Sequence, residues 1–264
     1  MILAVHIGNS IISVGFFDKA GDPLASFDLA SDIRRTSDEY LYMLRGISLD
    51  EGVNSKDVTG VIISSVVPQL TDILKCALSK FTNKTPMIIG PGVKTGFHIK
   101  IDNPSELGAD MVANTAAANR IKKEGRAAIV VDLRTVNTVS AIGKSGEYLG
   151  CSLFPGVQLS LDSMRINTAQ LPNVNISSQS KAIGKHSHSA IRSGVILGNA
   201  LTIDGLISRF AEEMNTSVSD IDLIATGECA QTVLCNSKYT FHYDEYLTLK
   251  GLYYIYTNNV DNNR

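Results

Sequence analysis

The sequence predicts an α/β protein made of two duplicated domains that face one another across a ligand cleft. Each half of the 264-residue chain opens with three short apolar runs separated by turns, a pattern typical of an antiparallel meander. Helical and strand-like stretches then alternate along each half. The segment around His6 recurs around Asp132, at the same place in the second half. We therefore expect one domain over residues 1–118 and a second over residues 119–264.

The first half begins with three expected strands at Ile2–Ile7, Ile11–Phe17 and 24–29, of which the last alternates apolar and polar residues. Thr36 followed by Glu39 is a capping-box pattern, which predicts a helix through residue 47. The later elements expected in this half are a buried strand at 61–67, a helix at 68–81 that opens with a proline, a strand at 86–89, and a helix from Asn103 to about residue 123.

The second half repeats this pattern. Its expected elements are strands at 127–133, 138–142 and 148–154, two helical stretches of which the longer covers 187–210, strands at 223–226 and 239–243, and a closing helix at 247–256. Gly194 and Gly198 lie about one turn apart on the long helix. They predict close helix packing, either within the chain or across a dimer.

Charge, apolar runs and cysteines exclude several classes of protein. The net charge of −2 argues against a protein that mainly holds nucleic acid or an anionic membrane. No apolar run reaches the roughly 18 residues of a membrane-spanning helix. The four cysteines form no C-x-x-C pair, and His186 and His188 alone do not make a zinc site. Free thiols in a reducing cytoplasm are therefore expected.

Four short segments have the composition of ligand-binding turns. Gly8–Ser10 and Thr135–Thr138 expose backbone N–H groups and small polar side chains that suit phosphate oxygens, although a Gly-Asn pair is also common in hairpin turns. Gly90–Gly96 is suited either to wrap a small ligand or to form a rigid turn. Thr226-Gly227 follows a strand and either approaches an adenine or ribose or only turns the chain.

Two carboxylates are the candidate chemical groups. Asp110 lies about two turns into the helix that is expected to begin at Asn103. A carboxylate there is either a surface residue or a base that accepts a hydroxyl proton during phosphoryl transfer. Asp132 lies at the end of a buried strand, and strand ends in this class of protein point at cations and phosphates.

Seven segments carry a resemblance to a known family: Gly90–Gly96, Asp102–Pro104, Gly108–Asp110, Gly146–Gly150, Pro155-Gly156, Ile183–Lys185 and Leu247–Leu252. In this order they resemble the type III pantothenate kinases, members of the acetate kinase/sugar kinase/Hsp70/actin superfamily. The resemblance runs nearly end to end and implies two ribonuclease-H-like, actin-like domains. It implies ATP-dependent phosphoryl transfer to the hydroxyl of pantothenate, the first step toward coenzyme A. It also implies Mg²⁺, a monovalent cation (K⁺ or NH₄⁺), and a cytoplasmic homodimer without nucleic acid or membrane partners.

The resemblance also assigns roles to individual residues. It implies that Asp110 is the general base and that Asp132 lies at the monovalent-cation site. It implies nucleotide contacts for His6, Gly8, Asn9, Ser10, Thr135, Asn137, Thr138 and Gly227. It implies pantothenate contacts for Gly92, Thr95, Gly96, Ile101, Gly108, Ala109 and Met111, and for Ser187 in the site of the partner subunit.

Several of these positions depart from the family pattern. His6 replaces an aspartate that helps organise Mg²⁺ and phosphate, and imidazole is a poor ligand for a hard cation. Met111 replaces an arginine that contacts the substrate, so a charge-assisted hydrogen bond is lost. Arg134 replaces a glycine of the second phosphate turn, where its side chain either crowds the nucleotide or binds its phosphate. The other departures are Ile101 for tyrosine, Asn137 for threonine and Glu228 for glycine.

These departures leave three hypotheses open. The first is a pantothenate kinase with weakened activity. The second is a catalytically inactive paralogue that acts as a ligand-binding or regulatory dimer. The third is a kinase for a different small acceptor, whose pocket is made more apolar by Ile101 and Met111.

Overall fold

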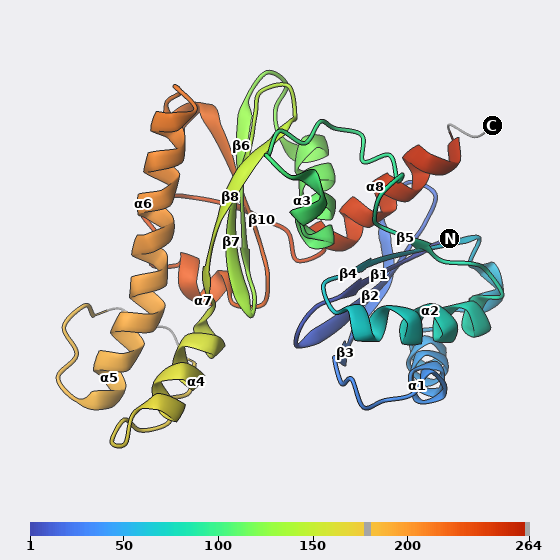
Figure 1. The fold of residues 1–264 in the computed structure, drawn as a ribbon, viewed down its shortest axis with the longest axis horizontal. Helices are drawn as coiled ribbons and strands as arrows, with labels where there is room; N and C mark the ends of the chain where they lie inside the picture. The colour runs from blue at the N-terminus through green and yellow to red at the C-terminus, as the bar shows by residue number, and fades with distance from the viewer. Residues whose placement is uncertain (177–180, 262–264) are drawn as a thin grey trace. The chain divides into compact units, whose positions relative to one another are not determined.

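The computed structural model describes residues 1–176 and 181–261, which belong to two compact units (Figure 1). The first unit consists of Met1–His98, Asp102–Arg120 and the chain from Tyr246 onward. The second unit consists of Ile99–Ile101 and Ile121–Glu245. Each unit has its own mixed sheet and its own core, which confirms the predicted α/β class. The predicted cleft between the halves stays a prediction.

The first unit contains a five-stranded sheet in the order β3-β2-β1-β4-β5. β1 pairs antiparallel with β2 and parallel with β4. β1 and β4 are buried along nearly their whole length, as expected for central strands rich in Val, Ile and Ala. The strands are β1 (Ile2–Ile7), β2 (Ile11–Phe17), β3 (Pro23–Ala30), β4 (Gly60–Ser65) and β5 (Met87–Ile88).

The sheet of the second unit repeats the first one. Its order, β8-β7-β6-β9-β10, begins with three antiparallel strands and ends with two strands parallel to the central β6. This order and these directions match those of the first sheet, which confirms the predicted duplication. The strands are β6 (Ala127–Leu133), β7 (Val136–Ile142), β8 (Tyr148–Pro155), β9 (Ile221–Thr226) and β10 (His242–Tyr243).

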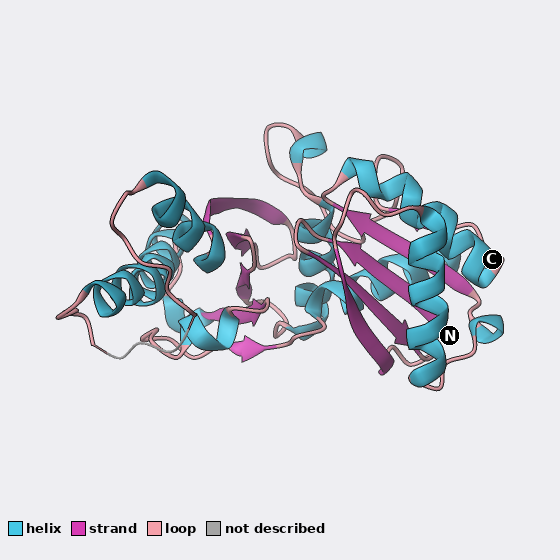
Figure 2. Cartoon of the chain, turned by 90° about the horizontal axis from the view of Figure 1, so that it is seen from below, coloured by secondary structure: helices cyan, strands magenta, loops and turns pink. Residues whose placement is uncertain are grey.

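Helices cover both faces of the first sheet (Figure 2). α1 (Ser37–Asp50) and α2 (Pro68–Thr82) pack on the face that carries Leu3 and Val5. α3 (Ala109–Ile121) and α8 (Leu247–Asp261) pack on the opposite face. In the second unit, the core face of the sheet is covered by α4 (Val157–Asn167), α5 (Ser187–Arg192), the π-helical turn Ser193–Leu197, α6 (Gly198–Glu213) and α7 (Ala230–Leu234).

The closing helix α8 belongs to the first unit, although the sequence places it in the second domain. Its Leu249 and Leu252 pack with Ala4 and Ile62 of the first sheet. The Tyr253 ring lies 5.7 Å from the ring of Phe17. The compact units therefore differ from the predicted ranges 1–118 and 119–264, because the apolar face of α8 is needed to cover the first sheet.

The start of α1 confirms the predicted capping box. The Glu39 N–H donates to Thr36 Oγ1 at 3.3 Å, and the Thr36 N–H donates to the Glu39 carboxylate at 2.7 Å. The Thr36 N–H and then its hydroxyl lower the pKa of Glu39. This carboxylate therefore supports the folded state above its ordinary pKa, and the support is lost as the pH falls through the lowered folded value.

We expect Thr36→Ala to destabilise the protein by about 1 kcal/mol, because one N–H in the first turn of α1 loses its acceptor. Urea denaturation followed by circular dichroism measures the change in the free energy of unfolding. Thr36→Ser is the matched control, since serine keeps the hydroxyl and is expected to retain most of the stability. An alanine variant as stable as the serine variant would contradict the role of the cap.

The long helix expected at 187–210 extends from Ser187 to Glu213 and includes the π-helical turn. By length and composition alone it is able to cross a bilayer, but half of its most apolar stretch is buried inside the protein. A soluble protein's core helix passes the same test, so this is weak evidence for a membrane span. Gly194 has no neighbouring atom within 4 Å of where a Cβ would lie, so close packing at this residue is not found in the described chain.

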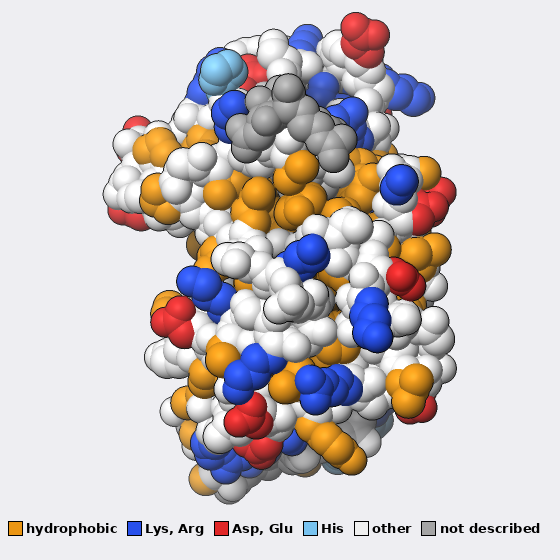
Figure 3. All heavy atoms as spheres, turned by 90° about the vertical axis from the view of Figure 1, so that its right-hand side faces the viewer, with side chains coloured by type: hydrophobic (Ala, Val, Ile, Leu, Met, Phe, Trp, Pro, Cys, Tyr) orange, Lys and Arg blue, Asp and Glu red, His pale blue; other side chains and the backbone are white. Residues whose placement is uncertain are grey.

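The surface carries charges of both signs. Figure 3 shows Lys and Arg side chains interspersed with Asp and Glu on one face, with hydrophobic side chains between them. Exposed ion pairs such as Lys80–Asp38 at 2.7 Å join some of these charges. Such pairs add little stability in water.

Candidate functional site

The central strands of the second unit carry three polar side chains near one end of the sheet. Asp132 of β6 pairs in register with Thr138 of β7 and with Thr226 of β9, so all three point to the same face. Asp132 is 3% exposed and the two threonines are also buried. Thr226 Oγ1 has no hydrogen-bond partner in the described chain. This face therefore presents a polar spot of the kind that a ligand group or a water molecule satisfies.

Backbone contacts fix the turn that follows Asp132. The Gly156 N–H donates to the Thr135 carbonyl at 3.0 Å, and the Cys229 N–H donates to the Leu133 carbonyl at 3.1 Å. A Cβ on Gly156 would overlap the carbonyl oxygens of this turn, and a Cβ on Gly227 would overlap the Leu133 backbone. Gly227 also has a φ of +100°, which favours glycine. Gly227 is predicted to contact the nucleotide. In the structure, the close approach of the Leu133 backbone already requires a residue without a Cβ at this position.

Arg134 forms an ion pair that neither sequence-based alternative anticipated. Its Nε donates to Asp132 Oδ1 at 2.9 Å. The Asp132 side chain is 4% exposed and that of Arg134 is 22% exposed, so the pair is largely shielded from water. The guanidinium therefore lies on the carboxylate that was expected to hold a monovalent cation.

Asn137 lies on the other face of β7, away from Thr138. It pairs in register with Leu133, whose side chain is part of the core. Its Nδ2 donates to Asn199 Oδ1 at 2.5 Å, and Asn199 Nδ2 donates to the Val195 carbonyl at 2.6 Å. Asn137 is fully buried. The structure therefore does not bring Asn137 together with Thr138 and Asp132, and its contacts tie β7 to the long helix.

The equivalent position in the first unit holds a buried histidine. His6 is 1% exposed, and its Nδ1 lies 2.7 Å from Oγ of Ser64, its partner on β4. Ser64 is fully buried. A Cβ on Gly8 would lie 3.3 Å from His6 Nε2, so the ring lies beside the following turn. Sequence reasoning missed Ser64, although a polar residue near the end of an apolar strand is the same signal that selected Asp132.

The turn Gly8–Ser10 is tied to the end of β3 through Ser31. The Ser31 hydroxyl donates to the Gly8 carbonyl at 2.6 Å, and the Ser31 N–H donates to the Ser10 carbonyl at 3.0 Å. The Gly8 N–H donates to the Ile11 carbonyl at 2.9 Å. Asn9 and Ser10 are exposed. The turn is therefore a fixed backbone with two exposed polar residues.

Asp110 lies in the first turn of α3, not two turns inside a helix. The cap and proline signals at Asn103 and Pro104 begin only a 3₁₀ turn, Pro104–Glu106, which ends in extended backbone at Leu107. α3 then begins at Ala109. The sequence-based position of Asp110 was wrong because two successive helical starts were interpreted as one.

The glycine before α3 makes room for the Asp110 carboxylate. A Cβ on Gly108 would lie 2.5 Å from Asp110 Oδ1 and 3.0 Å from Met111 Cε. Asp110 Oδ1 accepts the Met111 N–H at 2.8 Å. Gly108, Ala109, Asp110 and Met111 are all half-buried. α3 packs on the face of the first sheet that His6 shares with Ala4, so the structure brings this helix and His6 to one side of the sheet.

The loop that contains Gly92, Thr95 and Gly96 is anchored to the end of α8. Asn259 Oδ1 accepts the Lys94 N–H at 3.0 Å, and Asn259 Nδ2 donates to the Lys94 carbonyl at 2.9 Å. Gly92 and Gly96 both have positive φ values, of +91° and +87°. Thr95 Oγ1 donates to the Phe97 carbonyl at 3.1 Å. These contacts favour the rigid-turn alternative for the loop.

Ile101 and Ser187 lie at different places in the second unit. Ile101 ends the short segment from Ile99, which forms a bridge to Tyr148. Ser187 is the exposed first residue of α5, and the preceding His186 caps that helix by accepting the Ser189 N–H at 3.4 Å. The histidine near Ser187 therefore has a structural role.

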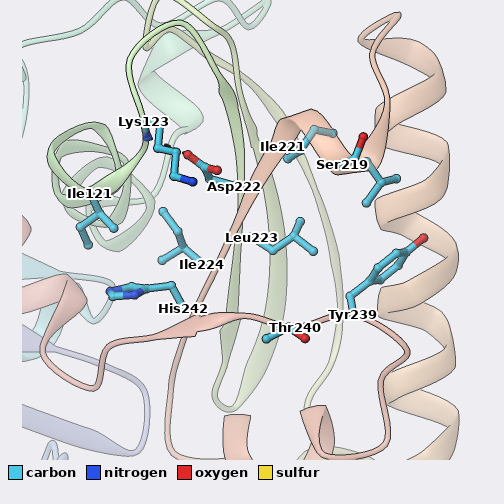
Figure 4. A pocket seen from close by; sticks show the side chains of 11 residues that line it. Ile121, Lys123, Ser219, Ile221, Asp222, Leu223, Ile224, Tyr239, Thr240 and His242 are labelled. Carbon is cyan, nitrogen blue, oxygen red and sulfur yellow. Dashed lines mark hydrogen bonds between the residues drawn. The ribbon is translucent and has the colours of Figure 1, made fainter.

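A cavity of about 600 Å³ lies beside β9 and β10 (Figure 4). None of the predicted site residues lines this cavity. Its wall includes residues 221–224 at the start of β9, and not Thr226 at the other end of that strand. Its carboxylate, Asp222, accepts hydrogen bonds from the Lys123 N–H at 2.7 Å and from Arg126 Nε at 2.8 Å. The cavity is therefore separate from the polar spot at Asp132.

Comparisons with known proteins show which family and which fold the chain resembles. The profile of the type III pantothenate kinase family matches residues 2–209. The chain is 36% identical over 259 residues to the type III pantothenate kinase of Shouchella clausii (strain KSM-K16), covering 98% of this chain and 100% of that relative. A Baf family protein of Campylobacter jejuni has a TM-score of 0.60 at 22% identity, covering 98% of this chain and 99% of that one. The activator of 2-hydroxyisocaproyl-CoA dehydratase from Clostridium difficile, with bound ADPNP, has a TM-score of 0.55 at 12% identity, covering 99% and 97% of the two chains.

Proposed function

This chain belongs to the type III pantothenate kinase family, and we propose that it transfers the γ-phosphoryl group of ATP to the hydroxyl of pantothenate. The observation that carries the proposal is the 36% identity to a type III pantothenate kinase across the full length of that relative. The two sheets of like strand order agree with the duplicated fold that the family resemblance implies. The inactive paralogue and the kinase for another acceptor have no such support.

Asp110 is the proposed general base. Asp110 takes the proton of the acceptor hydroxyl while the hydroxyl oxygen attacks the γ-phosphorus. The bond between the γ-phosphorus and the oxygen that bridges it to the β-phosphate breaks, and ADP leaves. Its support is the position in the first turn of α3, where the missing Cβ of Gly108 leaves room for the carboxylate. The turn Gly8–Ser10 is proposed to contact the phosphates through the backbone N–H groups and polar side chains of its two exposed residues, Asn9 and Ser10.

The direct test is release of ADP in a coupled assay with MgATP and pantothenate. Turnover of roughly 1–10³ s⁻¹ is expected of a small-molecule kinase, with the lower part of this range expected here because His6 and Met111 replace charged family residues. The same reaction without pantothenate is the control. Absence of pantothenate-dependent ADP release would reject the function.

MgATP is the proposed nucleotide substrate, and a cytoplasmic homodimer is the proposed state. Among residues 1–176 and 181–261, no cluster of three or more His, Cys, Asp or Glu residues is able to hold a metal ion. Because Mg²⁺ is commonly bound through substrate phosphates and one or two carboxylates, the proposed Mg²⁺ enters the site together with ATP.

The proposed homodimer is supported by one surface of the long helix. Open space surrounds Gly194 and Gly205 there, and Leu201 on the same helix is exposed.

The family also implies a monovalent cation at Asp132, and the residues present do not fit it. Oδ1 of this buried carboxylate already accepts a hydrogen bond from the Arg134 guanidinium at 2.9 Å. The charge that a monovalent ion would supply is therefore present in the chain.

We expect the double variant His6→Asp/Met111→Arg to raise kcat/KM for pantothenate by about tenfold or more. Met111→Arg supplies a guanidinium for an anionic substrate group, and each charge-assisted hydrogen bond is worth about 1.5–3 kcal/mol. His6→Asp restores an oxygen ligand at the end of β1. The coupled assay measures the change, with each single variant as a control. Unchanged turnover and unchanged ATP affinity in the double variant would contradict the assignment of both positions.

A further inference from the structure

Asp132 is a buried carboxylate that requires a compensating positive charge. Asp132 as a whole residue is 3% exposed. Its partners on the two adjacent strands, Thr138 and Thr226, carry neutral side chains. A carboxylate removed from water is stable only when it is paired with a cation and hydrogen-bonded. The Arg134 Nε–Oδ1 contact of 2.9 Å supplies both.

The position of Arg134 gives its guanidinium an advantage over a dissolved ion. Arg134 is joined to Asp132 through a single residue, and its turn is fixed by the hydrogen bonds from Gly156 and Cys229. A tethered group acts at a high effective concentration and pays little orientational entropy when it binds. Arginine also keeps its charge at every physiological pH. A monovalent ion at ordinary cellular concentration therefore competes poorly for this carboxylate.

We propose that the Arg134 guanidinium replaces the monovalent cation at Asp132, so that phosphoryl transfer by this chain requires neither K⁺ nor NH₄⁺. The inference rests on the proposed kinase function. Both an alkali ion and a guanidinium place one positive charge beside the carboxylate, and a guanidinium additionally carries directed N–H donors suited to carboxylate and phosphate oxygens. Arg134 thus acts as an internal counter-ion at the end of β6.

The first part of the test compares activity in potassium, ammonium and tetramethylammonium chloride at constant ionic strength. The native protein is expected to vary by no more than about twofold among the three salts, whereas Arg134→Gly is expected to lose about tenfold or more in tetramethylammonium and to regain activity in potassium or ammonium. Arg134→Lys keeps a tethered charge and is expected to remain independent of the salt. Activation of the native protein by potassium to the same extent as Arg134→Gly would overturn the proposal.

The second part uses thermal unfolding, which does not depend on turnover. Potassium should raise the Tm of Arg134→Gly by about 2–4 °C relative to tetramethylammonium, because an ion that binds only the folded state stabilises it. The Tm of the native protein should not change. Arg126→Gln is the matched control, since it breaks another arginine–aspartate pair of the same unit, with Asp222, and should show no potassium effect.

The two parts separate the possible failures. If no salt supports pantothenate-dependent ADP release, the kinase function fails, while the Tm comparison still tests the ion replacement. If potassium raises the Tm of the native protein as much as that of Arg134→Gly, the replacement fails whatever the activity. If Arg134→Gly does not fold, Arg134→Gln provides the same neutral test.

Discussion

Asp110→Asn should lower kcat by about 10²–10⁴-fold, because the amide cannot accept the proton of the attacking hydroxyl. The asparagine side chain has nearly the same shape, and its carbonyl oxygen is able to keep the hydrogen bond that Asp110 Oδ1 accepts from the Met111 N–H. The fold should therefore be retained, with little change in Tm. Coupled ADP release measures kcat, and thermal unfolding measures the fold.

Glu106→Gln is the matched control for this variant. Glu106 is an exposed carboxylate of the preceding 3₁₀ turn, where it accepts a hydrogen bond from Asn103 Nδ2 at 2.8 Å. It carries the same charge and lies close to Asp110 in the sequence, so a general electrostatic effect would appear in both variants. An Asp110→Asn enzyme within about threefold of the native kcat would remove Asp110 from the role of base.

Gly251→Ala should destabilise the first unit by about 3 kcal/mol. Gly251 lies in α8 where this helix approaches α3, and a Cβ there would overlap the carbonyl oxygen of Ala113. Backbone atoms yield less than flexible side chains, so the expected effect lies at the upper end of the 1–3 kcal/mol typical of overpacked cores. Urea denaturation gives the free energy of unfolding directly.

Gly46→Ala controls for helix propensity alone. Gly46 lies inside α1 and has no atom within 4 Å of the position of an added Cβ. Alanine is better than glycine in a helix interior, so this variant should be stabilised by about 0.5–1 kcal/mol. Opposite signs for the two glycine variants would confirm the close contact of α8 with α3. Equal stabilisation would show that the two helices do not approach so closely.

The sequence alone was sufficient to predict the duplicated sheets. Apolar runs of five to seven residues predict the buried strands β1, β2, β6 and β7. This signal is local, because it depends only on the residues of each run. The capping box at Thr36 and the proline that opens α2 are likewise local signals, and both helices begin where predicted. Asp132 was correctly placed near the end of a buried strand for the same reason.

Features that depend on distant contacts could not be predicted in this way. The packing of α8 on the first sheet depends on Ala4 and Ile62, far away in the sequence. The Asn103-Pro104 start signal was real, but nothing in its composition indicates that the helix stops at Leu107. The bond between Arg134 and Asp132 depends on the geometry of the β6–β7 turn, whereas sequence reasoning considered Arg134 only in relation to the nucleotide.

The packing of α8 has a consequence for the order in which the protein folds during synthesis. Residues 121–245, which make most of the second unit, are translated before α8. The sheet that was made first therefore lacks one of the two helices covering Ala4 and Ile62 until translation has passed through α8. Exposed apolar surface on a nascent chain promotes aggregation. A product cut short before residue 247 would keep that surface bare, so the stability of the amino-terminal half depends on translation continuing through α8.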